Sequence, residues 1–116
     1  MTKHTGSCHC GAVAYEVELD IGPVLSCNCS ICRRTGALLA FVPEGAFTLL
    51  EGQDDLRDYQ FNNHVIHHLF CQTCGIRSFG RGVAPDGSKM VAINVRCLDG
   101  VDLDSLKIER FDGASL

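Results

Sequence analysis

Short apolar segments separated by turn residues run along most of this 116-residue sequence. Several segments alternate apolar and polar positions, which is typical of strands that bury one face. The apolar stretch 37–42 would also fit a helix, but Pro43 and the turn at Gly45 favour a strand. The pattern predicts strands over residues 11–19, 23–27, 37–42, 47–51, 56–61, 64–71, 77–81 and 90–95.

Helical periodicity is scarce, and only residues 102–106 have the pattern of a single helical turn. Many short strands joined by regular turns predict an all-β domain of sandwich or barrel type. No repeat, linker or low-complexity segment divides the sequence, and its length is ordinary for one domain. We therefore expect residues 1–116 to form a single domain.

Composition and charge indicate a globular protein without a basic surface. Hydrophobic residues make up 46% of the sequence and charged residues 21%. The formal net charge is −4, and the ten Lys and Arg residues are scattered, so we expect no nucleic-acid or anionic-membrane partner. No apolar stretch has the length of a signal peptide or a membrane span, which predicts a cytoplasmic protein.

The cysteines change this picture, because seven of the eight lie in three short clusters. Spacings of CxC and CxxC let two thiolates reach one ion from a single turn, as in sulfur sites for zinc. Disulfides would need an oxidising compartment, which nothing in the sequence supports. Seven thiolates suit one closed site of four and one open site of three, so we expect two zinc ions per chain. The clusters are Cys8-His-Cys10, Cys27-Asn-Cys29-Ser-Ile-Cys32 and Cys71-Gln-Thr-Cys74.

The third cluster, followed by Gly75, has the pattern of a zinc knuckle. A redox CxxC motif or plain core cysteines are the alternatives. A redox motif would stand at the start of a helix in a βαβ unit, whereas this cluster lies in a turn between two predicted strands, so the redox motif fits poorly. Cys8 and Cys10 need two further ligands, and Cys71 and Cys74 would complete a four-sulfur site. We expect that closed site to be structural.

The middle cluster brings Cys27, Cys29 and Cys32 within six residues, so one loop can hold an ion from three sides. A zinc ion with three protein ligands keeps a fourth position for water or substrate, as catalytic sites do. Arg33 follows directly and is a candidate contact for an anionic substrate, and the turn at Gly36 is a second candidate. Spacing alone leaves iron open as an alternative metal, although common iron sites fit seven cysteines less well.

The remaining candidate residues have ordinary interpretations. Cys97 stands alone at the end of an apolar strand and is expected to be a small buried hydrophobe. His64, His67 and His68 are expected to be solvated or hydrogen-bonded. On a strand, His67 and His68 face opposite sides, so at most one of that pair can serve a given site.

Four motifs occur in a fixed order: Cys8-x-Cys10-Gly, Cys27-x-Cys29-Ser-x-Cys32-Arg-Arg-x-Gly, Phe70-Cys-x-x-Cys-Gly75 and Ala92-Ile-Asn-Val-Arg-Cys-Leu-Asp-Gly100. Together they resemble the glutathione-dependent formaldehyde-activating enzyme family, which includes centromere protein V. The resemblance implies a zinc-bound, mostly antiparallel, tent-like β fold of the Mss4-like type. It also implies a structural zinc on the first and third clusters and a catalytic zinc on the middle one.

The family activity implied by this resemblance is carbon–sulfur lyase chemistry, the reversible condensation of formaldehyde with glutathione to S-(hydroxymethyl)glutathione. The expected partners are therefore a small thiol such as glutathione and a small aldehyde. Because this chain is shorter than the enzyme for which the family is named, a small thiol other than glutathione is an alternative substrate. The alternative is a non-catalytic module with two zinc ions that presents a surface to a protein partner. An open second site with a pocket beside Cys32 would favour the enzyme.

Overall fold

The computed structural model describes residues 2–61 and 65–115, which form two β-sheets. One α-helix of four residues, α1 (Cys32–Thr35), occurs in these ranges. No helix in the described ranges has the length and apolar character needed to cross a bilayer. The strands are β1 (Lys3–Ser7), β2 (Ala14–Glu18), β3 (Val24–Cys27), β4 (Leu39–Pro43), β5 (Phe47–Glu51), β6 (Leu56–Tyr59), β7 (His67–Cys71), β8 (Phe79–Val83), β9 (Lys89–Asn94) and β10 (Ile108–Phe111).

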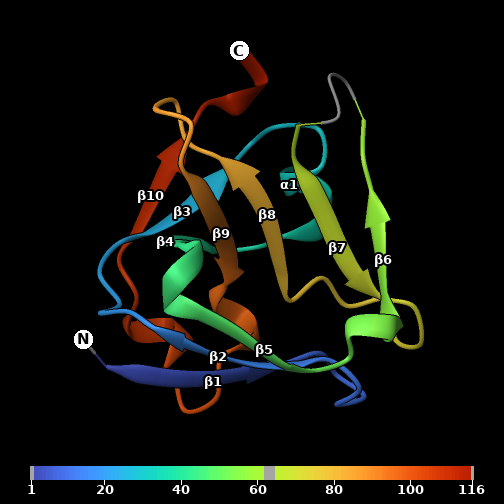
Figure 1. Cartoon of the computed structure of the whole chain (residues 1–116). Coiled ribbons are helices and arrows are strands. Elements are labelled where there is room, and N and C mark those ends of the chain that lie inside the picture. Colours follow the sequence, from blue (N-terminus) through green and yellow to red (C-terminus); the bar gives the residue numbers. More distant parts are fainter. Residues whose placement is uncertain (1, 62–64, 116) are drawn as a thin grey trace.

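The smaller sheet has the strand order β1-β2-β5, and the larger has the order β10-β3-β4-β9-β8-β7-β6. The smaller sheet lies across one end of the larger, whose strands fan out above it (Figure 1). Strand pairs in the part of the chain that the structure describes are antiparallel, apart from the parallel pair of β3 and β10. This arrangement confirms the expected all-β, mostly antiparallel fold.

All eight expected strands are present; the strand expected over 47–51 has the same ends in the structure, and the others are shifted or shortened. The strand expected over 64–71 begins at His67, while His64 lies outside the described residues. The strand expected over 77–81 becomes β8. The helical turn expected over 102–106 is the 3-10 helix η4 (Leu103–Ser105).

The hydrophobic pattern did not predict β1 or β10. Strand β1 has the polar sequence KHTGS, and all four residues of β10 are exposed. Both are edge strands, held by backbone hydrogen bonds to β2 and β3 rather than by a buried face. A strand of this kind carries no apolar alternation, because alternation records burial and not pairing.

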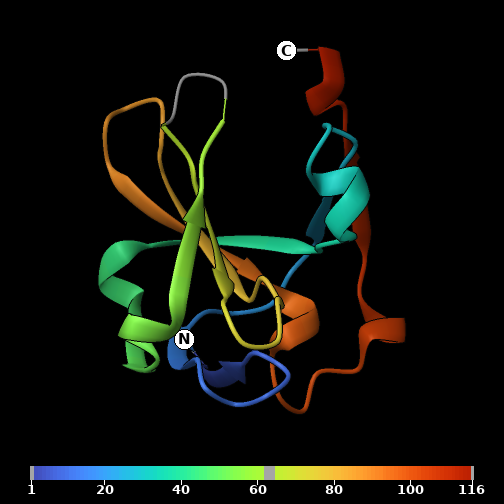
Figure 2. The ribbon, with the colours of Figure 1, turned by 90° about the vertical axis from the view of Figure 1, so that its right-hand side faces the viewer.

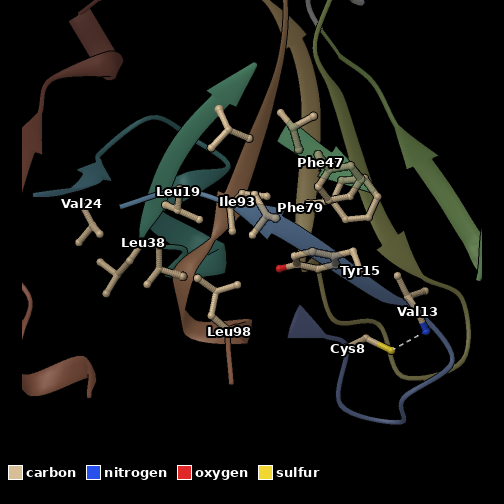
Figure 3. Close-up of a cluster of buried hydrophobic side chains, with 14 of the residues drawn as sticks. Cys8, Val13, Tyr15, Leu19, Val24, Leu38, Phe47, Phe79, Ile93 and Leu98 are labelled. Carbon is tan, nitrogen blue, oxygen red and sulfur yellow. Dashed lines mark hydrogen bonds between the residues drawn. The ribbon is translucent and has the colours of Figure 1, made fainter. Parts of the chain in front are cut away.

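The core lies between the two sheets and is centred on three aromatic rings (Figure 3). The rings of Tyr15, Phe47 and Phe79 have centroids 4.7–5.6 Å apart, and the Tyr15 hydroxyl donates a hydrogen bond to the Ser78 carbonyl at 3.1 Å. Aliphatic side chains of β2 and β9 surround them. The core extends to Cys8 and Cys71, which are 3% and 1% exposed. Two of the predicted metal ligands are therefore part of the packed interior.

Candidate metal centres

The sulfur atoms of Cys8, Cys10, Cys71 and Cys74 all lie within 4.8 Å of one another. The Sγ atoms of Cys8 and Cys10 are 3.7 Å apart, and those of Cys10 and Cys71 are 3.6 Å apart. A tetrahedral zinc ion with bonds of about 2.3 Å to sulfur separates its sulfur ligands by roughly 3.8 Å. The four thiols therefore have the spacing of a closed metal site, and the first and third clusters meet as the sequence predicted.

Two tight turns aim these thiols at a common point. Gly11 and Gly75 follow the two cysteine pairs with φ angles of 83° and 79°, which glycine adopts without steric penalty. The backbone N–H of Val13 donates to the Cys8 sulfur at 3.3 Å (Figure 3), and that of Thr73 donates to the Cys71 sulfur at 3.4 Å. Such bonds favour the thiolate that a metal requires, as expected for a zinc knuckle.

The pKa values of these thiols diverge because the four sulfur atoms compete for protons. Backbone N–H groups of Cys10 and Ile76 lower the pKa of Cys74 to about 6. For Cys10, the Ala12 N–H lowers the pKa, but desolvation and the neighbouring sulfurs, including that of Cys71, together raise it to about 11. Close thiols resist full ionisation unless a cation neutralises them. A divalent ion supplies that charge, so the donor set fits a metal such as zinc.

The second group consists of Cys27 at the end of β3, Cys29 in the following turn and Cys32 at the start of α1. Their sulfur atoms also lie within 4.8 Å of one another, and the Cys29 N–H donates to the Cys27 sulfur at 3.4 Å. The short helix holds the loop closed, because the Arg33 N–H donates to the Cys29 carbonyl at 3.0 Å. No fourth His, Cys, Asp or Glu among the described residues joins this group. One loop thus presents three thiols to one point.

Burial dominates the electrostatics of this loop. Desolvation and the neighbouring thiols of Cys29 and Cys27 raise the pKa of Cys32 to about 12, whereas the positive Arg77 guanidinium acts in the opposite direction. Burial also works against ionisation of Cys29, but the Cys32 backbone N–H and the adjacent thiols outweigh it and lower the pKa. As in the first group, three neighbouring thiols need a cation before all of them ionise.

The C-terminal segment covers one side of the three-cysteine loop (Figure 2). The Asn28 side chain donates to the Asp112 carboxylate at 3.0 Å and accepts from the Ala114 N–H at 2.9 Å. A Cβ atom placed on Gly113 would lie 2.5 Å from the Cys27 sulfur, so the chain passes directly over this thiol. Sequence reasoning missed this contact, because it depends on the parallel pairing of β10 with β3.

The three-cysteine group opens into a groove of about 700 Å³. Its walls include the apolar side chains of Phe41, Ile66 and Phe111, which are 53%, 51% and 42% exposed. Two polar side chains, His68 of β7 and Arg77 just before β8, also line it. A half-enclosed apolar groove with a few polar groups is the usual form of a small-molecule site.

The arrangement of strands and cysteines now has a counterpart among known proteins. Residues 3–110 match the model of the glutathione-dependent formaldehyde-activating enzyme family. The chain belongs to the glutathione-dependent formaldehyde-activating enzyme family. A crystal structure of a Rhodobacter sphaeroides protein is similar, with 34% sequence identity and a TM-score of 0.78, over 90% of this chain and 99% of that one. The resemblance inferred from the cysteine motifs is thereby confirmed.

In this member of the formaldehyde-activating enzyme family, the two neighbouring histidines face opposite ways, as expected. The His67 ring lies 2.6 Å from the Asp58 carboxylate, while His68 is 6% exposed and stacks on Phe61 in the groove. His64 lies outside the described residues. Cys97 is half-buried in the 3-10 helix η3 (Val95–Cys97) and belongs to neither cysteine group.

The two candidate substrate contacts predicted beside the loop differ in position. Arg33 is exposed and lines the groove. Gly36 ends α1 with a φ of 71°, and its carbonyl accepts a hydrogen bond from Arg96 at 3.0 Å. Gly36 is not among the groove-lining residues that the structure describes. A role in substrate contact stays a prediction for both residues, and the visible role of Gly36 is to end the helix.

Replacing Gly113 with alanine tests how tightly the C-terminal segment must pass over this family member's loop. The added methyl group would meet the Cys27 sulfur, so the loop or the segment must shift. We expect the affinity of the three-cysteine group for zinc to fall by about 10-fold to 100-fold, which is the usual loss when a residue that supports a metal ligand is changed. Competition with a chromogenic chelator measures this affinity.

Gly45→Ala is the matched control, since a Cβ atom there meets nothing within 4 Å. Its zinc affinity should equal that of the wild type. An unchanged affinity in Gly113→Ala would show that the segment can move away from the loop without consequence.

Proposed function

We propose that this chain is a zinc-dependent carbon–sulfur lyase that joins a small thiol and a small aldehyde reversibly. The family points to glutathione and formaldehyde as substrates. The observation that carries the proposal is a three-thiol group without a fourth described ligand, facing a groove, beside a separate group of four. In this proposal the catalytic zinc is held by Cys27, Cys29 and Cys32, and the structural zinc by Cys8, Cys10, Cys71 and Cys74.

The reaction forms one bond and moves one proton. The thiol sulfur attacks the carbonyl carbon, a carbon–sulfur bond forms, and the proton of the thiol ends on the former carbonyl oxygen. Bound zinc would stabilise the substrate sulfur as a thiolate beside the aldehyde. Three thiolate donors make the site a weak Lewis acid, which suits exchange of a fourth thiolate better than hydrolysis. The apolar groove walls hold the two reactants together and limit the access of water.

The alternative, a non-catalytic module with two zinc ions, requires a closed second site or a missing pocket. His67, a described residue that could have closed the second site, is paired with Asp58 and does not join the three-cysteine group. The groove lies directly beside Cys32. Both observations favour the enzyme over the interaction module.

The proposal predicts a specific response to thiols. Purified protein should contain two zinc ions per chain, and glutathione should slow the removal of one of them by a chelator, because it occupies the open position that the chelator would otherwise use. Exchange spectroscopy with 13C-formaldehyde should show faster interconversion of free aldehyde and thiol adduct when the protein is added. Two zinc ions that ignore every thiol, with no faster exchange, would contradict the proposal and favour the interaction module.

A further inference from the structure

Two buried polar atoms, which belong to residues that line the groove, have no hydrogen-bond partner within residues 2–61 and 65–115. They are Nδ1 of His68 and Nη1 of Arg77. Both residues line the groove into which the three-cysteine group opens. Buried polar atoms are nearly always paired, because leaving one unpaired costs free energy, and the cost is larger for a charged group. An unpaired pair of this kind beside a reactive centre points to a ligand that completes it.

The fold holds both side chains in place. The Arg77 carbonyl accepts a hydrogen bond from the Asn94 side chain at 3.0 Å. His68 pairs in register with Gly80, where an added Cβ atom would lie 3.4 Å from Nη2 of Arg77. The His68 ring stacks on Phe61 with its centroid 5.2 Å away. The absence of a side chain at Gly80 makes room for the guanidinium, and stacking on Phe61 orients the imidazole, so the backbone of both residues and the ring of His68 are positioned before a ligand binds.

The charges around the groove favour an anion. Three arginines, Arg33, Arg34 and Arg77, line it, whereas no Asp or Glu occurs among its described lining residues. This is unusual for a chain with a formal net charge of −4. Burial and the nearby Arg77 charge lower the pKa of His68, which favours the neutral ring, so the half-buried Arg77 supplies the positive charge at this point.

Of the three arginines, only Arg77 combines burial with an unpaired donor. The Arg34 guanidinium donates to the Ser30 carbonyl at 2.7 Å, and Arg33 is exposed, where solvent weakens its attraction for an anion. A half-buried guanidinium binds a carboxylate through two parallel hydrogen bonds. The neutral His68 ring beside it offers one further polar contact.

We propose that Arg77, with His68 beside it, forms the subsite for the carboxylate of an acidic thiol substrate. The inference rests on the proposed function, since it assumes that the thiol sulfur occupies the open side of the three-cysteine group. The apolar side chains of Phe41 and Ile66 then contact the carbon chain between sulfur and carboxylate. Arg77 is in this view a specificity-determining residue, which selects acidic thiols over neutral ones.

Two thiols of equal length test this subsite. 3-Mercaptopropionate and 3-mercaptopropionamide differ only in the charged end, so their kcat/KM values with formaldehyde isolate the carboxylate contact. We expect Arg77→Leu to lower kcat/KM for the acid by at least about 10-fold, and for the amide by less than about 3-fold, as for loss of one charge-assisted contact. Arg77→Lys keeps the positive charge but lacks the planar guanidinium that forms two parallel hydrogen bonds. Its kcat/KM for the acid should lie between those of the wild type and Arg77→Leu.

Arg57→Leu is the matched control, because Arg57 is exposed on β6 and bonded to Gln72 away from the groove. It should leave both kcat/KM values unchanged. An equal loss for the acid and the amide in both Arg77 variants would overturn the subsite while leaving the lyase proposal standing.

A binding measurement separates the two proposals. In zinc-loaded protein, the Arg77 Nε–H resonance should shift on titration with 3-mercaptopropionate and stay in place with the amide. A selective shift without any accelerated exchange would retain the anion subsite and refute the lyase. The same resonance responding equally to both thiols would refute the carboxylate subsite.

Discussion

Cys71→Ser is expected to unfold this protein at room temperature, or to lower its free energy of unfolding by at least about 4 kcal/mol. Cys71 is 1% exposed at the edge of the core, so the change removes a proposed ligand and also buries a hydroxyl group. Structural zinc sites of small domains contribute about 10–16 kcal/mol of apparent binding free energy. This binding free energy is as large as the whole free energy of unfolding of a typical domain, about 5–15 kcal/mol. Circular dichroism, thermal unfolding and zinc content measure the effect.

The control for this prediction is Cys97→Ser, the same chemical change at a half-buried cysteine outside both groups. It should cost about 1 kcal/mol, the usual effect of a single substitution, and leave two zinc ions per chain. A Cys71→Ser protein with wild-type thermal stability and full zinc content would show that the four-cysteine group is not the structural site.

Cys29→Ser should have the opposite pattern, a folded protein without activity. Cys29 is only partly buried, and its loop lies outside the main core, so we expect a stability loss of about 1 kcal/mol. Zinc content should fall from two ions to one per chain, because two remaining thiols hold zinc weakly. Thiol–formaldehyde exchange should slow by more than about 100-fold, because loss of a ligand should cost more than loss of a group that only supports a ligand.

Ser30→Ala provides the comparison within the same loop, since Ser30 is exposed and its described hydrogen bond uses the backbone carbonyl. Its zinc content should match that of the wild type. Unfolding of Cys29→Ser with loss of both zinc ions would argue against separate structural and catalytic roles. Retained exchange with one zinc ion would place catalysis elsewhere.

The sequence was most informative where the relevant interactions are local. Strands that bury one face were predicted from alternation, because burial leaves a period of two in the sequence. The cysteine pairs were recognised because both cysteines of a pair come from one turn, where spacing alone determines whether two thiols can reach one point. The first cluster also lies beside the third, as expected for CxC and CxxC pairs that need partners from elsewhere, while the metal-binding role of the four cysteines stays a prediction. The prediction of a single domain stays a prediction.

Tertiary structure decided everything that depends on which strands lie side by side. The edge strands β1 and β10 carry no apolar alternation, and only their backbone partners reveal them. The parallel pairing of β10 with β3 brings Gly113 over the Cys27 sulfur, although the two are far apart in the sequence. The joining of β7 to β8 and of β8 to β9 places His68 and Arg77 beside the middle cluster. Local sequence records burial and turns, whereas segments distant in the sequence form a groove. The unpaired guanidinium of Arg77 in the groove lining therefore became visible only in the folded chain.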